Sequence, residues 1–440
     1  MELKKENDFP VYMNWAILFF LAIILASLAF SIRIFNSISI ISLVLIVFIS
    51  SKRKALLLKP FTSPVFLSLL LFFLIQVAGL LYTNDQQIQI KEITQKAGII
   101  AIPFFFMSGV SVPSSRIQQL IGFFSICLCC VSVYCLIHAY AIYNATNNIT
   151  VFFYHDLLKP FDLHAVFFSW YLFFVILFWL ESNVLSKKST LYKTLIILNI
   201  LFFIFLIILL SSKLVIICLI LYGLFFTARA LILNKVRFLW LAMFLGILVS
   251  VLLYIGMSKN PISNRFRDLT SGNDTLFLQN KFSPDVYFNG LQFRLLTWRL
   301  TGKILSENKA WLFGVSAGDA QQKLNEQYKL SHVYLGDGKL STGFLNFNCH
   351  NVYLQSLLES GIVGLIILIL FIVFLLIQIV KTKNWMTLIY FICMIAFGFS
   401  ESLLSSQYPI QLFLFLPLLL VVSNNKDQSY LFLRGERYFL

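Results

Sequence analysis

The 440-residue chain has few charged side chains, since Asp, Glu, Lys and Arg together make up 12% of it. Soluble globular domains carry about 25% charged residues, so a set of ordinary soluble domains is excluded. Hydrophobic side chains make up 59% of the sequence. They form repeated runs of about 20 residues, the length that a helix needs to cross a hydrocarbon core of about 30 Å. The sequence therefore predicts an all-α, polytopic membrane protein.

The sequence also lacks a cysteine pattern that would hold a metal ion or form a disulfide framework. Six of the seven cysteines lie inside apolar segments, and only Cys349 lies in a polar one. We interpret them as small packing residues. The six apolar ones are Cys127, Cys129, Cys130, Cys135, Cys218 and Cys393.

Twelve apolar segments are candidate membrane spans, and this number sets the expected architecture. In chain order they are Trp15 to Ile32, Phe35 to Ser50, Pro64 to Tyr82, Ala97 to Val110, Ile117 to Tyr143, Leu163 to Leu180, Leu195 to Leu210, Leu214 to Leu231, Phe238 to Gly256, Ile362 to Val380, Trp385 to Phe399 and Tyr408 to Val422. The first is too long for the core of a signal peptide, so we expect it to be retained.

The distribution of Lys and Arg predicts the orientation of these spans. With a cytoplasmic N-terminus, the cytoplasmic connections, adjoining helix ends and tails carry 18 basic residues, and the short outer connections carry five. Cytoplasmic loops are enriched in Lys and Arg, so both termini are expected in the cytoplasm. Residues 1–257 then hold nine spans, residues 258–349 form one large external loop, and residues 350–440 hold three spans and a cytoplasmic tail.

The external loop has 11 basic and seven acidic residues and thus a charge of +4, within a chain of formal charge +15. A basic surface beside a membrane suits lipid phosphates and pyrophosphates, and the placement does not favour nucleic acid. Within the loop, the apolar spacing from Gly290 to Leu305 predicts an amphipathic helix at the membrane interface. Arg294 and Trp298 would share one face of it, and Arg299 and Lys303 would form a neighbouring basic pair.

His350 stands where the polar loop meets the tenth span. An imidazole can accept a proton near neutral pH, which makes His350 a candidate base, although the position also suits an interfacial or helix-capping residue. Gly361 and Gly364 follow on the same helix and would let another helix approach closely.

His350 is followed after ten residues by Gly361-Ile-Val-Gly364, and the predicted helix carries Arg294-Leu-Leu-Thr-Trp298. A glycine-rich turn follows this helix, Trp311-Leu-Phe-Gly314-Val-Ser-Ala-Gly318. These three features resemble the O-antigen ligase and O-antigen polymerase superfamily. A weaker match is Ser211-Ser212-Lys213, where the family commonly has a Ser-Arg pair, so that Lys keeps the charge but loses the bidentate guanidinium.

The resemblance implies a glycosyltransferase that acts with inversion at the periplasmic face of the cytoplasmic (inner) membrane, in lipopolysaccharide or other polysaccharide biosynthesis. It would move a glycan from an undecaprenyl-pyrophosphate carrier to a sugar hydroxyl of lipid A-core or a related glycan acceptor, with the lipid bilayer as surroundings. His350 would be the base and Arg294 would neutralise the pyrophosphate. Further candidates for substrate binding are Lys213, Arg265, Trp298, Arg299, His164 and Glu401.

No cofactor or metal is expected, because the first outer connection has no carboxylate, and Asp85 and Glu92 in the second are seven residues apart. Cationic side chains would do the work of a metal ion. Within the same fold, the sequence leaves ligase and polymerase open, with ligase favoured. A flippase or transporter is the alternative of another class, but inverted repeats and midplane charges, which are typical of transporters, are not evident.

Overall fold

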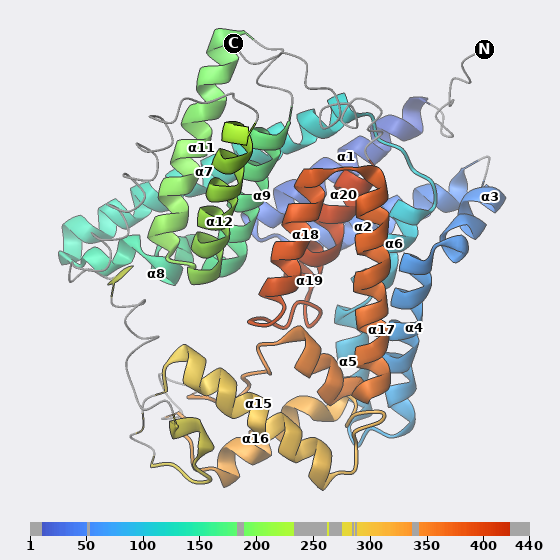
Figure 1. Ribbon diagram of the computed structural model, residues 1–440, viewed down its shortest axis with the longest axis vertical. Coiled ribbons are helices and arrows are strands. Elements are labelled where there is room, and N and C mark those ends of the chain that lie inside the picture. The colour runs from blue at the N-terminus through green and yellow to red at the C-terminus, as the bar shows by residue number, and fades with distance from the viewer. Residues whose placement is uncertain are drawn as a thin grey trace.

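The computed structural model describes residues 11–50, 53–182, 189–232, 262–263, 275–283, 286, 288–336 and 343–422. The secondary structure of these residues is helical, as predicted (Figure 1). The helices before the large loop are α1 (Val11–Phe30), α2 (Arg33–Ile49), α3 (Arg53–Leu58), α4 (Pro64–Ala78), α5 (Gln86–Gln95), α6 (Gly98–Met107), α7 (Ser114–Thr146), α8 (Tyr154–Leu158), α9 (Ala165–Glu181), α11 (Thr190–Leu210) and α12 (Lys213–Ile232). The later ones are α15 (Gly290–Glu307), α16 (Ala317–Leu330), α17 (Val352–Thr382), α18 (Trp385–Phe397), α19 (Gln407–Ile410), a π-helical turn (Gln411–Phe415) and α20 (Leu416–Val421).

Each expected span that falls within the described residues coincides with a helix or a run of helices, and the ninth, Phe238 to Gly256, lies outside them. Within the described residues, five helices are long and apolar enough to cross a membrane, or six if the bent pair Tyr154–Phe161 and Ala165–Glu181 forms one span. Three shorter apolar helices accompany them, among them α2 and α18. The chain is therefore a multi-pass membrane protein, whereas the count of twelve spans and their orientation stay predictions.

The bundle is built around α9, which is apolar on every side. Its residues from Phe168 to Trp179 are all buried, as expected for a helix that neighbouring helices surround. The rings of Trp170 and Phe174 contact the ring of Tyr390 on α18. The outer helices instead expose apolar side chains on one face, such as Ile41 on α2, which is the pattern of a lipid-facing surface.

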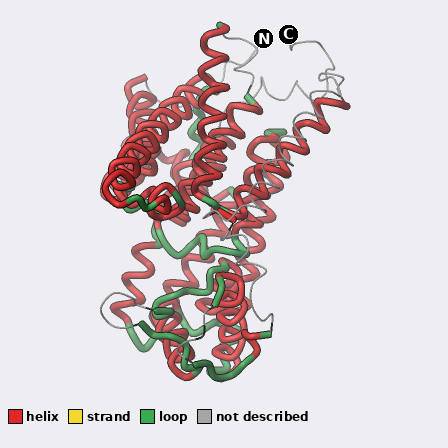
Figure 2. Tube along the Cα trace, turned by 90° about the vertical axis from the view of Figure 1, so that its left-hand side faces the viewer, coloured by secondary structure: helices red, strands yellow, loops and turns green. Residues whose placement is uncertain are grey.

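The large loop folds into a small helical lobe at one end of the bundle (Figure 2). The capping box of Asn289 and Gln292 begins α15, and Phe293, Leu296 and Leu300 of this helix pack with Tyr328 of α16 in a separate apolar core. The prediction of an amphipathic helix is confirmed. Its assignment to the membrane interface was wrong, because the apolar side faces this protein core.

Two glycines of the predicted motif join this lobe to the bundle. Gly361 breaks α17 with a left-handed φ of 65°, and a Cβ there would lie 2.2 Å from the carbonyl oxygen of Leu312. At Gly314, φ is 73° and a Cβ would lie 2.5 Å from the backbone of Glu359. Backbone hydrogen bonds from Ile362 N–H to Trp311 O (2.8 Å) and from Val315 N–H to Leu358 O (2.8 Å) close the joint.

The expected role of Gly361 and Gly364 in helix–helix approach was therefore wrong. At Gly361 the partner is the backbone of the turn before α16, and a Cβ on Gly364 would meet Ser360 of the same broken helix at 2.3 Å. Since only glycine adopts a left-handed conformation without strain and leaves room for a second backbone, the motif specifies a docking joint.

We predict that Gly361→Ala lowers the free energy of unfolding by about 1–3 kcal/mol, because the added methyl group overlaps the Leu312 carbonyl. Thermal unfolding of the purified protein in detergent measures the effect. The matched control is Gly302→Ala within α15, where nothing lies within 4 Å of the added Cβ. This control should be neutral or up to about 1 kcal/mol more stable, because alanine favours helix. Equal melting temperatures for both variants would contradict the close backbone contact at Gly361.

Candidate active site

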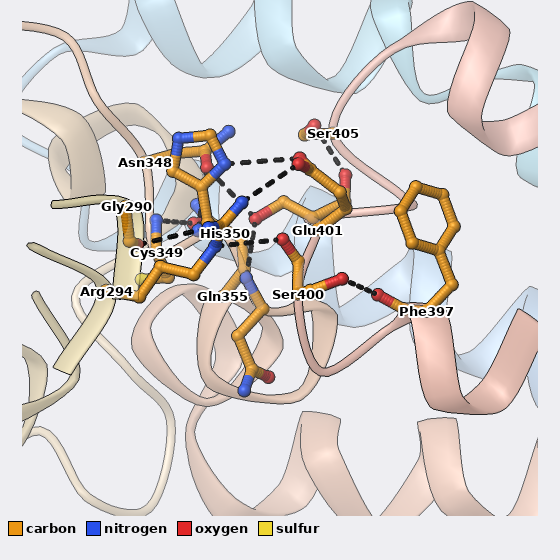
Figure 3. A network of polar contacts seen from close by, with 12 residues as sticks. Gly290, Arg294, Asn348, Cys349, His350, Gln355, Phe397, Ser400, Glu401 and Ser405 are labelled. Atoms are coloured by element: carbon orange, nitrogen blue, oxygen red, sulfur yellow. Dashed lines mark hydrogen bonds and ion pairs between the residues drawn. The ribbon is translucent and has the colours of Figure 1, made fainter. Parts of the chain in front are cut away.

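Three segments that are far apart in the sequence meet at the carboxylate of Glu401 (Figure 3). Arg294 comes from α15, His350 precedes α17, and Glu401 lies in the loop after α18. Glu401 Oε1 is 3.3 Å from Arg294 Nη2, and its Oε2 is 3.1 Å from His350 Nδ1. The predicted convergence of Arg294 and His350 is therefore present, and Glu401 connects the two.

The backbone holds His350 in a specific, costly conformation. Its φ is +43°, and a left-handed residue other than glycine costs on the order of 1–3 kcal/mol, which is typical of functional sites. The side chain of Asn348 accepts the His350 N–H at 2.9 Å and supports this turn. The cap of α17 is Asn351, which accepts from Tyr353 N–H and Leu354 N–H. His350 is thus not the cap, and its ring faces Glu401.

The charge state of Glu401 determines which nitrogen of the His350 imidazole is able to act as a base. Burial raises the pKa of Glu401, but the hydrogen bond from His350 and the positive charges of His350 and Arg294 outweigh it, so the pKa lies below its ordinary value. An ionised carboxylate only accepts hydrogen bonds, so His350 Nδ1 must carry the proton that it shares with Oε2. In the neutral imidazole, Nε2 is then the nitrogen that carries the lone pair, and within the described residues it has no hydrogen-bond partner. With 25% of the His350 side chain exposed, Nε2 can take a proton from a bound hydroxyl.

Arg294 supports this pair and keeps part of its donor capacity. Its Nε donates to Ser400 O at 3.3 Å, its Nη1 to Gly290 O at 3.1 Å, and its Nη2 to Glu401. A guanidinium has five N–H groups, so two remain for a ligand. The ion pair with Glu401, however, cancels most of the positive charge that Arg294 offers to an anion.

Trp298 shares the face of Arg294, as predicted, and its Nε1 donates to Cys349 O at 3.1 Å. This bond fixes the backbone beside His350. Arg299 points elsewhere: its two terminal nitrogens donate to the carbonyls of Leu278 and Gln279. The structure thus ties Arg299 to another loop segment and does not bring it to Glu401.

His164 belongs to the cluster. It immediately precedes α9, and its ring lies 4.6 Å from the rings of both His155 and Phe167. Burial lowers the pKa of His164, Glu401 opposes this shift, and the charges of His350 and Arg294 lower the pKa further. A cavity of about 320 Å³ opens beside it, lined among others by Arg33, His155 and Asp162.

The two remaining candidates are placed less directly. Lys213 begins α12 after a left-handed turn at Ser211. Arg229 in the last part of α12 pairs with Glu181 at the end of α9, so the two helices run in the same direction and Lys213 lies at the end of the bundle where α9 begins. Arg265 lies outside the described residues.

A buried chain of polar groups lies behind the site and was not predicted from the sequence. Gln355 accepts from Cys349 N–H at 3.1 Å and donates to Glu359 Oε1 at 2.7 Å, and Glu359 Oε2 lies 2.7 Å from Lys96 Nζ. Lys96 and Glu359 are 2% and 6% exposed. The four-residue spacing of Gln355 and Glu359 on the helix that follows His350 was the available signal in the sequence. Nothing in the sequence indicates that Lys96, between α5 and α6, is their partner.

The carboxylates weighed as metal ligands have structural partners. Asp85 caps α5 by accepting from Ile88 N–H at 2.9 Å, and Glu92 lies 3.6 Å from Lys96 Nζ. Across the described residues, no group of three His, Cys, Asp or Glu side chains could hold a metal ion.

The fold and the site define a multi-pass membrane protein with a cluster of polar and charged side chains at one end of its helical bundle. Residues 197–369 match the model of the family described as O-antigen ligase. The match contains Lys213, Arg294, His350 and Gly361, so the resemblance to this family is confirmed over this part of the chain. The family comprises glycosyltransferase-like enzymes of the ligase and polymerase type. A comparison with curated proteins finds no match to this chain.

We predict that Glu401→Gln lowers the free energy of unfolding at pH 7 by about 1.5–3 kcal/mol, because charged hydrogen bonds to Arg294 and His350 are lost. The folded-state pKa of Glu401 is below its ordinary value of 4.5, so its contribution is present above pH 4.5 and is lost as the pH falls through the folded pKa. Thermal unfolding in detergent at pH 7 and at successively lower pH measures the difference between the two proteins, which should shrink on the acid side.

Glu326→Gln is the control, because Glu326 makes a partly exposed ion pair with Lys323 at 3.3 Å. Such surface pairs contribute about 0–1 kcal/mol, so this variant should melt close to the unmodified protein. A Glu401→Gln deficit that is the same at every pH would argue against an ionised, stabilising carboxylate.

Proposed function

We propose that this protein is an O-antigen ligase-like glycosyltransferase, which transfers a glycan from an undecaprenyl-pyrophosphate carrier to a sugar hydroxyl of lipid A-core or a related acceptor. The observation that carries the proposal is the contact of His350 Nδ1 with Glu401 (3.1 Å) beside Arg294, with the other imidazole nitrogen open to a substrate. This arrangement supplies an oriented base in a domain of the O-antigen ligase family.

In the proposed reaction, His350 Nε2 takes the proton of the acceptor hydroxyl as its oxygen attacks the anomeric carbon of the donor. The new carbon–oxygen bond forms on the face opposite the leaving group, so the configuration is inverted. The bond from the anomeric carbon to the phosphate oxygen breaks, and its electron pair leaves with the lipid pyrophosphate. Glu401, ionised and hydrogen-bonded to Nδ1, stabilises the imidazolium that results.

The departing pyrophosphate needs positive charge. The two unused N–H groups of Arg294 can donate to it, and such preorganised donors act most strongly where charge develops. We assign Lys213 and Arg265 as further cations and His164 to the sugar side of the cluster. Trp298 acts as a positioning residue through Cys349 O. Of the candidates, Arg299 has the least support, because carbonyl oxygens occupy its guanidinium.

The topology that fits this reaction places residues 258–349 and the cluster on the periplasmic side of the inner membrane, with both termini in the cytoplasm. Support comes from the excess of Lys and Arg in the opposite connections. A ligase is favoured over a polymerase because the His350-to-Gly361 signature and the Arg294 helix resemble that branch more. In cells that lack the gene, a ligase predicts loss of every lipid A-linked ladder while carrier-linked polymer accumulates, and a polymerase predicts a single-repeat product.

We predict that His350→Ala abolishes glycan transfer almost completely, because no base remains for the acceptor hydroxyl. Arg294→Ala should lower the rate on the order of 10²- to 10³-fold, as for other preorganised charge stabilisers. Both are measured as transfer from a defined lipid-pyrophosphate glycan by purified protein, with equal membrane abundance confirmed.

Lys303→Ala on the same helix is the control. Lys303 is half exposed and pairs with Glu307 at 3.7 Å, so its loss should leave the rate unchanged. Transfer at the unmodified rate by His350→Ala would exclude its role as the base.

We further predict that transfer persists in excess chelator, because cationic side chains take the part of a metal ion at the leaving group. The assay is the same transfer reaction with and without chelator, followed by addition of magnesium or manganese. Activity that vanishes in chelator and returns with either metal would overturn this part of the mechanism.

A further inference from the structure

An exposed apolar segment lies where the lobe meets the bundle, in the turn between α15 and α16. Its side chains, Trp311, Leu312 and Phe313, are 43%, 54% and 56% exposed. The backbone of this turn is fixed, because Trp311 O accepts from Ile362 N–H at 2.8 Å. Phe313 O accepts from the Tyr82 hydroxyl, also at 2.8 Å. The joint therefore holds three large apolar side chains outside the protein core, and exposed apolar patches mark a protein partner or a membrane.

Two rows of exposed apolar side chains on the bundle lead to this turn. One row lies on α4 and the turn that follows it, and the other lies on α17 after its break. The exposed residues are Leu67, Leu71, Leu74 and Leu81 in the first row and Ile362, Ile366, Ile369 and Val373 in the second. Such rows on membrane helices face lipid. Because α4 packs against α17, the turn lies at the common end of both rows (Figure 1).

The length of α17 places the turn at a membrane boundary. After the break at Gly361, the helix continues from Ile362 to Thr382, which is about 30 Å at ~1.5 Å per residue. This length equals the thickness of a hydrocarbon core of about 30 Å. Lys381 and Lys383 lie at one end of the helical segment, where it leaves the core. The opposite end, with the turn bonded to it, therefore lies at the other boundary.

The composition of the turn is typical of a membrane interface. Tryptophan is enriched at this level, because its ring is apolar and carries one polar N–H. Trp311 Nε1 donates to Ser306 Oγ of α15 at 3.3 Å, so the lobe satisfies the polar group of the exposed ring. Lys309, two residues earlier, is exposed and carries a positive charge that attracts lipid phosphates.

We propose that Trp311, Leu312 and Phe313 insert into the lipid surface of the membrane and hold the lobe against it. The partner is the bilayer, because the turn extends the lipid-facing rows of α4 and α17. The lobe then contacts lipid through this turn, whereas the apolar side of α15 faces the core of the lobe. Since α15 carries Arg294, the contact also fixes the height of Arg294 relative to the bilayer. The inference does not depend on the reaction proposed above.

Fluorescence quenching of Trp311 tests this contact. The full-length protein is placed in nanodiscs of phosphatidylcholine whose acyl chains carry bromine near the glycerol. The emission of the Trp311→Phe variant is subtracted from that of the unmodified protein, so that the difference reports Trp311. The brominated lipid should remove most of this emission, because bromine quenches only the rings that it contacts. Lipid brominated near the chain end should remove less, and acrylamide in the aqueous phase should have little effect.

Leu330→Trp in the Trp311→Phe protein is the matched control. Leu330 is another exposed apolar residue of the lobe, at 61%, but it ends α16, about 20 Å along this helix from the turn. Acrylamide should quench the new tryptophan, and the brominated lipid should not. Equal quenching by brominated lipid at both positions would overturn the proposal, since the lobe would then contact lipid over its whole surface.

A second variant tests the neighbours of Trp311. Replacing both Leu312 and Phe313 by serine keeps the backbone hydrogen bonds of the turn, so the melting temperature should stay close to that of the unmodified protein. Quenching of Trp311 by brominated lipid should fall, and its emission should shift to longer wavelength.

Two results with the unmodified protein would overturn the proposal. Quenching of Trp311 by acrylamide and not by brominated lipid would place the turn in water. Quenching by neither would show that a second copy of the chain or another protein covers it.

Discussion

The Glu401 carboxylate is the interaction on which the site depends, because it joins the lobe, the start of α17 and the loop after α18. More than 100 residues of the chain separate Arg294 from Glu401, and His350 lies between them. Removing one partner of a buried ion pair costs on the order of 3–5 kcal/mol, since the remaining charge loses its compensation. Arg294 is 30% exposed, which reduces this cost here, but Glu401 is only 13% exposed. The same contact therefore assembles the site and fixes the imidazole tautomer.

That contact requires the lobe to be held at a fixed place against the bundle, and glycine provides the joint. Gly361 and Gly314 let two backbone segments meet and exchange hydrogen bonds directly. Behind them, Lys96, Glu359 and Gln355 extend the polar connection to Cys349, the residue before His350. Buried polar groups that are fully satisfied give a rigid, specific arrangement. The motif thus contains both His350 and the glycine that fixes the position of the surrounding segments.

Hydropathy predicted most of the helices, because each apolar run of span length has few other ways to satisfy its backbone in a membrane. The motif also predicted His350 and Arg294 as neighbours. Glu401 was a weaker candidate, since its role depends on two partners that only the tertiary structure brings together. The helix that carries Arg294 was assigned to the membrane interface because its amphipathic pattern does not say whether protein or lipid covers the apolar face. Lys96 is one of the five basic residues counted in the short outer connections, because nothing near it in the sequence indicates a contact with Glu359.

The charge balance of the cluster has a consequence for how such a site handles an anionic leaving group. The ion pair of Arg294 with Glu401 is neutral overall, and in the proposed reaction the imidazole becomes cationic as it takes a proton from the acceptor. In the proposed reaction, attraction for the pyrophosphate before that moment therefore comes from cations that lack a carboxylate partner. Arg294 acts on the departing pyrophosphate through its two unused N–H groups, and Glu401 orients the base. The charge that binds the donor and the charge that orients the base are then carried by different side chains.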